Sequence, residues 1–264
     1  IEKLKSRGVK FIEPEEGELA CKTIGPGRLA NLDTIFERVT NHFKKFHDLQ
    51  GLRILVTAGP THEPLDPVRY ISNPSSGKMG YAVAEQAKAR GAEVVLISGP
   101  THLKPPMGVG FKACKTAGEM NSLVQECFPE CDVLVMSAAV GDFTAEKLEK
   151  EKIKKTSREG QTLNLVPTKD ILMEVSKIKT QQFVVGFAAE TQNLIQSALE
   201  KLRNKKLDLI VANDISAPGI GFQSDNNQVT LVDSNEQVEN LPRMAKQEIA
   251  NILLDKISRG TREK

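Results

Sequence analysis

The sequence lacks features that several classes of protein need. It has no tryptophan and only two tyrosines, Tyr70 and Tyr81, so it offers few aromatic platforms for stacking single-stranded nucleic acid. No stretch approaches the ~18 consecutive apolar residues of a membrane helix. The formal net charge is only +2, which leaves no molecule-wide field to attract nucleic acid or a membrane surface. We therefore expect neither as a partner.

Cysteine is also scarce. The four cysteines are Cys21, Cys114, Cys127 and Cys131, and no second cysteine pair or histidine pair gives them the spacing of a structural zinc site. The chain opens with charged residues, not with the apolar core of a signal peptide. We expect reduced thiols and a cytoplasmic protein. Because Ile1 replaces an initiator methionine, we also expect a piece of a longer protein.

The first 50 residues differ from the rest of the chain. They are punctuated by glycine and proline, and only residues 32–46 show the apolar spacing of an amphipathic helix. Such a segment has too few apolar residues for a core of its own. We interpret residues 1–50 as an appendage and residues 51–264 as the main domain.

From residue 52 onward, apolar runs alternate with helical patterns. Continuous apolar runs are typical of strands that are buried on both faces of a sheet. Strands that alternate with helices imply right-handed crossovers and a mostly parallel sheet. The sequence therefore predicts a Rossmann-like, doubly wound α/β fold with helices on both faces. The expected strands are 52–58, 92–99, 110–116, 132–140, 183–190, 208–214 and 227–235, and the expected helices are 79–91, 117–128, 168–178, 191–206 and 241–258.

Ligands of such sheets bind beyond the carboxyl ends of the strands. The loop from Ala58 to Lys78 is irregular and long for its position, where ~2–6 residues are usual. It ends in Ser75, Ser76 and Gly77 at the start of a helix, where backbone amides bind anions. Ordinary helix capping by a serine is the alternative interpretation. The loop spells neither a Walker motif nor G-x-G-x-x-G.

Four later parts of the chain carry polar groups. Small residues from Ser137 to Gly141 precede Asp142, which is suited to a metal or a ligand hydroxyl; a tight turn is the alternative. Residues 151–155 (EKIKK) form either a solvated surface or a cationic clamp on polyphosphate. Residues 212–214 and 224–227 fit a polar ligand site or a cluster of Asx turns. Lys201 and Lys205 either point at phosphates or interact with the helix dipole.

Six motifs, in this order, resemble one family: TAGPTHEPLDPVRYISNPSSGKMG, SAAVGDF, EKIKK, VVGFAAET, DLIVAND and GFQSDNN. The chain from about residue 51 to 258 is similar to the bacterial phosphopantothenoylcysteine synthetases, or phosphopantothenate–cysteine ligases, of coenzyme A biosynthesis. The resemblance implies that the carboxylate of 4′-phosphopantothenate attacks CTP, with Mg²⁺, to give an acyl-cytidylate and pyrophosphate. The amine of L-cysteine then displaces CMP. It also implies a homodimer.

The resemblance assigns roles to particular residues. It makes Lys152 the main catalytic cation and a nucleotide contact, and Asn73 the residue that holds the acyl intermediate. Arg69 lies in the same loop and is suited to gripping a phosphate or carboxylate, and Ser75, Ser76 and Gly77 complete the substrate contacts. The remaining nucleotide contacts that it implies are Met136, Ser137, Ala138, Asp142, Lys169, Asp170, Ile171, Leu172, Phe187, Lys201 and Lys205.

Two departures from the family pattern stand out. The residues that follow Asp142 are Phe143, Thr144 and Ala145, where the family has an aromatic residue, arginine and proline. In many bacteria the ligase follows a flavin-dependent decarboxylase, and residues 17–28 resemble the tail of that domain. Cys21 then matches the catalytic cysteine of the decarboxylase, although Lys22 follows it in place of glycine. FMN would belong to the full-length decarboxylase domain and is not expected in this chain.

Two other functions are compatible with the fold class. A nicotinamide-dependent oxidoreductase would need a glycine-rich turn after the first strand and an acidic residue after the second, but the second strand ends in Ser98, Gly99 and Pro100. A nucleotide-binding protein without catalysis is the other alternative. The lysines and Asp142 favour the ligase over both, and the eukaryotic relatives that use ATP leave the choice of nucleotide open.

Overall fold

The computed structural model describes residues 1–5, 7, 9–18, 22–44, 47–154, 162–190, 193–214 and 224–262. The chain divides into two compact units, Ile1–Asp48 and Leu49–Lys264. The sequence places the corresponding boundary between residues 50 and 51.

The first unit has little regular structure. It contains the short helix α1 (Glu2–Lys5), the antiparallel strands β1 (Glu15–Glu18) and β2 (Ile24–Arg28), and the helix α2 (Leu32–Lys44). The side chains of Leu32 and Phe36 on α2 are exposed, so this amphipathic helix does not bury its apolar side within the described part of its unit. Cys21, the expected decarboxylase residue, lies outside the described residues.

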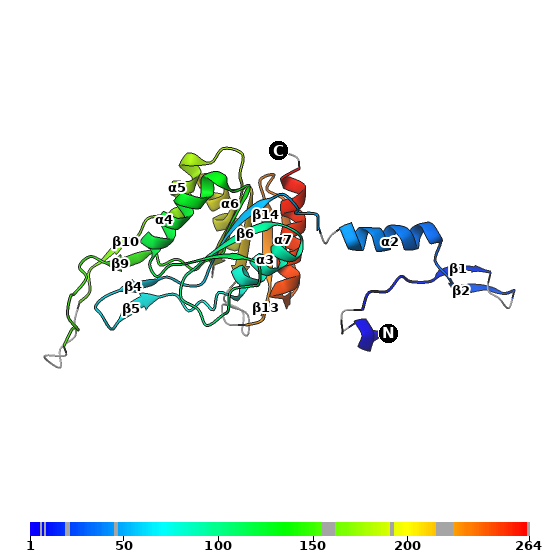
Figure 1. The fold of residues 1–264 in the computed structure, drawn as a ribbon, viewed down its shortest axis with the longest axis horizontal. Coiled ribbons are helices and arrows are strands. Elements are labelled where there is room, and N and C mark those ends of the chain that lie inside the picture. The colour runs from blue at the N-terminus through cyan, green and yellow to red at the C-terminus, as the bar shows by residue number, and fades with distance from the viewer. Residues whose placement is uncertain are drawn as a thin grey trace. The chain divides into compact units, whose positions relative to one another are not determined.

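The second unit is built on a sheet of eight strands in the described residues (Figure 1). Its order is β15-β14-β12-β11-β8-β3-β6-β7, and the six strands from β12 to β7 are parallel. Taken in chain order, those six follow the 3-2-1-4-5-6 arrangement of a doubly wound sheet. The bounds are β3 (Arg53–Ala58), β6 (Glu93–Ser98), β7 (Gly110–Ala113), β8 (Val133–Met136), β11 (Phe183–Glu190), β12 (Leu209–Asp214), β14 (Val229–Asp233) and β15 (Val238–Asn240).

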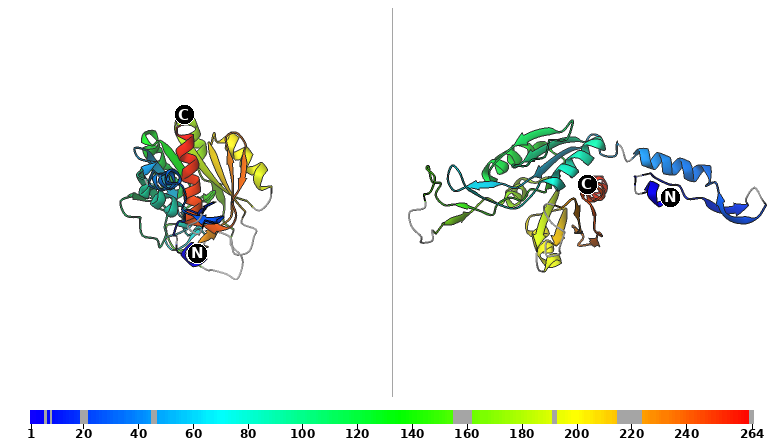
Figure 2. Two further views of the ribbon diagram at one scale, coloured as in Figure 1. Left: turned by 90° about the vertical axis from the view of Figure 1, so that its right-hand side faces the viewer. Right: turned by 90° about the horizontal axis from the view of Figure 1, so that it is seen from below.

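Helices cover both faces of the sheet (Figure 2). The helices α3 (Lys78–Ala89) and α7 (Lys246–Gly260) pack on one face, and α4 (Ala117–Cys127), α5 (Ile171–Ile178) and α6 (Leu194–Asn204) pack on the other. The 3₁₀ turn Phe128–Glu130 follows α4 directly. The predicted α/β fold is confirmed. None of the helices in the described part of the chain is both long and apolar enough to cross a membrane.

The central strands are buried because both of their faces meet helices. Ile54 and Val56 of β3 pack into the core on the α3 and α7 side, whereas Leu55 packs into the core on the other side. Gly80 lets α3 approach β3 closely, since a Cβ there would lie 2.6 Å from the Cβ of Ala58. The start of α3 is therefore held against the end of β3.

Several predicted bounds are wrong. The loop from Ala58 to Lys78 was expected to be irregular, but it contains the hairpin strands β4 (His62–Pro64) and β5 (Tyr70–Ser72). A second hairpin, β9 (Phe143–Ala145) with β10 (Leu165–Pro167), was not predicted. Strands of three residues are too short to show a hydrophobic period.

The last helix also differs from its prediction. It was expected over residues 241–258, but α7 starts at Lys246. Residues 241–245 instead run into the two-residue strand β16 (Met244–Ala245), which pairs with β13 (Asn226–Asn227). Pro242 interrupts the apolar spacing there, and the backbone pairing with β13 takes the place of a first helical turn.

Candidate functional site

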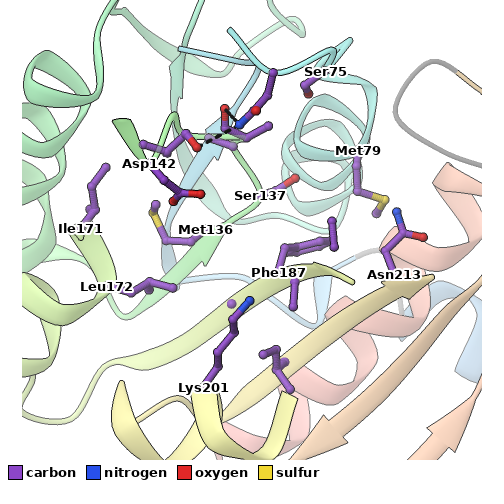
Figure 3. Close-up of a pocket in the computed structure, with 18 of the residues that line it drawn as sticks. Ser75, Met79, Met136, Ser137, Asp142, Ile171, Leu172, Phe187, Lys201 and Asn213 are labelled. Carbon is purple, nitrogen blue, oxygen red and sulfur yellow. Dashed lines mark hydrogen bonds between the residues drawn. The ribbon is translucent and has the colours of Figure 1, made fainter. Parts of the chain in front are cut away.

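A cavity of about 600 Å³ lies beyond the carboxyl ends of the parallel strands. Residues that follow β3 and β8 line it together with the end of β11, so it sits where the strand order reverses, the usual ligand site of this fold. Of the residues singled out in the sequence, the cavity brings together Asn73, Ser75, Gly77, Met136, Ser137, Ala138, Asp142, Lys169, Asp170, Ile171, Leu172, Phe187, Lys201 and Lys205. Figure 3 shows several of these side chains around the opening.

The first wall is the start of α3. Gly77 is its N-cap and has a φ of 77°, a conformation that glycine adopts readily. A Cβ on Gly77 would lie 2.8 Å from the Thr101 side chain and 3.3 Å from the Cα of Gly59. The Ser75 hydroxyl oxygen accepts a hydrogen bond from the Gly77 backbone N–H at 3.3 Å. The helix start thus faces the cavity across a turn that lacks bulky side chains, as anion binding requires.

The second wall is the loop from Ser137 to Asp142. Hydroxyl and amide groups from other segments fix it. The Ala138 and Gly141 backbone N–H groups donate to the hydroxyls of Thr57 and Thr61, at 3.2 and 2.9 Å. The side-chain amide of Asn73 donates to the carbonyls of Ala139 and Val140, at 3.3 and 3.0 Å. These two side-chain hydrogen bonds of Asn73 join the loops after β3 and β8.

The third wall is the start of α5 with the end of α6. The Asp170 carboxylate caps α5 by accepting from the Met173 N–H at 3.1 Å, and it lies 2.7 Å from the Lys205 ammonium. Burial alone would raise the pKa of Asp170, but Lys205 and the backbone donors lower it overall. Asp170 is therefore ionised at neutral pH. It holds Lys205 on the cavity wall beside Lys201.

Apolar groups form the floor. Phe187 lies between small residues on β11, and Met136 and Leu172 line the same cavity (Figure 3). At the far end is Asn213, which is 9% exposed and whose side-chain oxygen has no hydrogen-bond partner among the described residues. A buried polar atom that lacks a partner costs free energy. A ligand that filled the cavity and donated to this oxygen would remove that cost.

Three of the expected site residues are not among those that line the cavity: Arg69, Ser76 and Lys152. Arg69 donates through Nε to the Asp66 carboxylate at 2.9 Å and through Nη2 to the Ile153 carbonyl at 2.7 Å. Its guanidinium is therefore engaged within the chain in this structure, and its grip on a ligand stays a prediction. Lys152 is exposed and lies next to Ile153, which the same contacts hold.

Sequence reasoning missed two lysines on the cavity wall, Lys78 and Lys246. Lys246 is only 6% exposed, which is rare for lysine. Burial, followed by the nearby charge of Lys78, lowers the pKa of Lys246 to about 8. No sequence signal marks this residue, because the predicted helix placed it in its second turn, not at its start.

The three cysteines of the described residues, Cys114, Cys127 and Cys131, do not line this cavity. Burial raises the pKa of the Cys114 and Cys131 thiols to about 12 in each case, so neither is a nucleophile at neutral pH. Among the described residues, no group of three or more histidine, cysteine, aspartate or glutamate side chains is arranged to hold a metal ion. The cavity instead offers several lysines, a helix start, an apolar floor and Asp142. This combination suits a phosphorylated ligand with a flat ring.

Comparison with known proteins decides the family. Residues 49–261 match the model of the DNA/pantothenate metabolism flavoprotein C-terminal domain. The chain belongs to this family. The resemblance that the six motifs predict is confirmed.

Two members of known name are similar along most of the chain. The coenzyme A biosynthesis bifunctional protein CoaBC of Escherichia coli strain K12 is 44% identical over 261 residues, which cover 97% of this chain and 64% of that protein. CoaBC of Bacillus subtilis strain 168 is 43% identical over 261 residues, which cover 98% of this chain and 64% of that protein. The chain thus spans about 64% of the length of these relatives.

A solved structure shows the same fold in this family. The crystal structure of the C-terminal domain of coenzyme A biosynthesis bifunctional protein CoaBC superposes with a TM-score of 0.71 at 39% sequence identity. The match covers 83% of this chain and 100% of that one.

Proposed function

We propose that residues 49–264 are a ligase that joins 4′-phosphopantothenate to L-cysteine through an acyl-cytidylate, with CTP as the activating nucleotide. The observation that carries this proposal is the cavity at the strand-order reversal, which combines Lys201, Lys205, the start of α3 and Asp142 in one space. Membership of a family whose named members act in coenzyme A biosynthesis supports it.

Different residues of the cavity would serve different steps of such a reaction. A flat base fits against Phe187 and the small residues that precede and follow it on β11. The lysines and the start of α3 would stabilise the negative charge that develops on the phosphates as pyrophosphate leaves. The loop joined by Asn73 would hold the acyl group in line with the α-phosphate.

The nucleotide would bring Mg²⁺ with it. Magnesium usually binds one or two carboxylates together with substrate phosphates, and not a cage of protein ligands. Asp142 is the carboxylate on the cavity wall that Lys205 does not already neutralise, so this donor set fits a metal carried by a triphosphate. When bound, the ion neutralises charge on the phosphates.

Lys152 would act from outside the cavity. It lies in an exposed segment between the β9 and β10 strands, and this segment is tied to the loop between β4 and β5 through Ile153. We propose that Lys152 reaches over the phosphates once substrate is bound.

We also propose that the protein forms a homodimer. Light scattering in solution tests this by measuring the molar mass of the particle.

The deciding experiment measures pyrophosphate release. The chain is mixed with 4′-phosphopantothenate, L-cysteine and Mg²⁺, and CTP or ATP is added in parallel reactions. We expect release that depends on the phosphopantothenate and is faster with CTP, with phosphopantothenoylcysteine found by mass spectrometry. Absence of release with either nucleotide would contradict the ligase, and faster release with ATP would contradict only the choice of CTP.

The amino-terminal unit is a separate proposal. We propose that residues 1–48 are the end of a decarboxylase domain whose flavin-binding part lies elsewhere in the full-length protein. The chain spans about 64% of the CoaBC relatives, which leaves room for such a domain. Flavin absorbance in the full-length protein, but not in this chain, would support the assignment.

A further inference from the structure

Lys78 and Lys246 mark a part of the cavity that none of the expected contacts explains. Lys78 is the first residue of α3 and Lys246 is the first residue of α7. The two helices pack side by side on the same face of the sheet. The first residues of two neighbouring helices therefore deliver two lysines to one wall of the cavity.

The same two lysines also line a second cavity. It has a volume of about 520 Å³ and adjoins the first, since both cavities are lined by Lys78 and Lys246. The carboxylates of Glu85 and Asp225 face this second cavity, but neither lines the first. An anion in the second cavity would face Glu85 and Asp225 as well as the two lysines. An anion in the first cavity would face the lysines without these two carboxylates.

The charged groups around the lysine pair differ in their exposure to water. Asp225 lies 2.6 Å from the Lys78 ammonium, but its side chain is 85% exposed, so water screens its charge. Lys246 is nearly buried, and burial of a lysine disfavours its charged form. A bound anion would reverse that effect, because it would stabilise the protonated form in a place from which water is mostly excluded.

We propose that Lys78 and Lys246 form a phosphoryl subsite on the wall between the two cavities. The start of α3 adds the partial positive charge of its backbone N–H groups. The ligand class is a di- or triphosphate. This assignment rests on the proposed function: the group bound there is the part of the nucleotide that departs as pyrophosphate. Lys201 and Lys205, which line another part of the same cavity, then lie toward the α-phosphate.

Inorganic pyrophosphate is the probe, because its binding does not require the chain to be a ligase. Isothermal titration calorimetry gives its Kd for the wild-type chain, Lys246→Gln and Lys246→Arg. We expect Lys246→Gln to weaken binding about 10- to 100-fold, as for loss of one charged hydrogen bond, and Lys246→Arg to stay within about tenfold of the wild type. Lys78→Gln should weaken binding by a similar factor.

Lys104→Gln is the matched control, because Lys104 lines the second cavity but not the first. Its Kd should stay within about twofold of the wild type. A wild-type chain that fails to bind pyrophosphate, or a Lys246→Gln variant that folds by circular dichroism and binds as tightly as the wild type, would overturn the subsite. If pyrophosphate binding depends on Lys246 but no ligase activity is found, the subsite stands and the proposed function fails.

Discussion

Two aspartates near the cavity each hold a cation, with opposite results. Asp66 lies between β4 and β5, and its side chain is 0% exposed. It accepts from the Arg69 side chain and from the backbone N–H groups of Val68, Arg69 and Ile153. Asp170 caps α5 with a side chain that is 45% exposed, and it pairs with Lys205.

The difference lies in where each aspartate leaves its cation. The buried Asp66 holds Arg69, which does not line the cavity, and both contact Ile153 in the segment that carries Lys152. The half-exposed Asp170 leaves Lys205 on the cavity wall, with 22% of its side chain exposed. One pair therefore ties two loops together, and the other pair leaves its cation on the cavity wall.

The largest expected effect comes from the residue that the Asp66 pair holds in place. Lys152→Gln should slow pyrophosphate release about 100- to 1000-fold, the usual loss when one preorganised charge on a transition state is removed. Its Tm should not change, because Lys152 is exposed. Lys147→Gln is the control, since that lysine lies in the same segment with 80% of its side chain exposed. Equal losses in both variants would show that general charge, and not Lys152, matters.

Breaking the Asp66 pair itself should cost stability. Asp66→Asn leaves the guanidinium of Arg69 without its buried carboxylate, and the expected drop in Tm is about 5–10 °C, measured by calorimetry. Asp225→Asn breaks an exposed pair with Lys78 and should shift Tm by less than about 2 °C. A smaller shift for Asp66→Asn than for Asp225→Asn would mean that burial does not set the strength of these pairs.

The sequence predicted the sheet and part of the cavity for the same reason. Buried parallel strands appear as continuous apolar runs, and the loops that follow them meet at one edge. The positions of Ser75, Ser137 and Asp142 in such loops therefore suffice to place these residues together. The resemblance to a family supplied the cavity residues that no run marks, such as Lys169 and Phe187.

The rest depends on contacts that the sequence does not show. Arg69 stands three residues from Asp66, but nothing in that spacing says that the carboxylate is buried or that Ile153, far along the chain, joins the pair. Lys246 became a wall residue because α7 starts there, after pairing between β13 and β16. Both depend on long-range packing, which leaves no local pattern.

The Asp170 pair can be divided into its two parts. Asp170→Ala removes both the cap of α5 and the partner of Lys205, and it should lower the free energy of unfolding by about 1 kcal/mol. Asp170→Asn keeps a good capping residue and removes only the charge. It should therefore lower the free energy of unfolding by less than Asp170→Ala does. Urea denaturation measures both. If the two variants are equally destabilised, the ion pair and not the cap carries the stability.

The smallest expected effect is the pH dependence of that ion pair. Burial opposes ionisation of Asp170, but Lys205 and the backbone donors together lower its folded-state pKa overall. The stability that it contributes is therefore present above the ordinary carboxyl pKa of about 4 and is lost as pH falls below it. Urea denaturation at a series of pH values measures this. At pH 7 the free energy of unfolding of the wild type should exceed that of Asp170→Asn by a few tenths of a kcal/mol. That gap should close toward about pH 2, because a protonated Asp170 no longer attracts Lys205, whereas Asp66 contributes equally to both chains. A gap that stays constant with pH would mean that the charge of Asp170 does not hold Lys205, and that the two carboxylate pairs differ in more than burial.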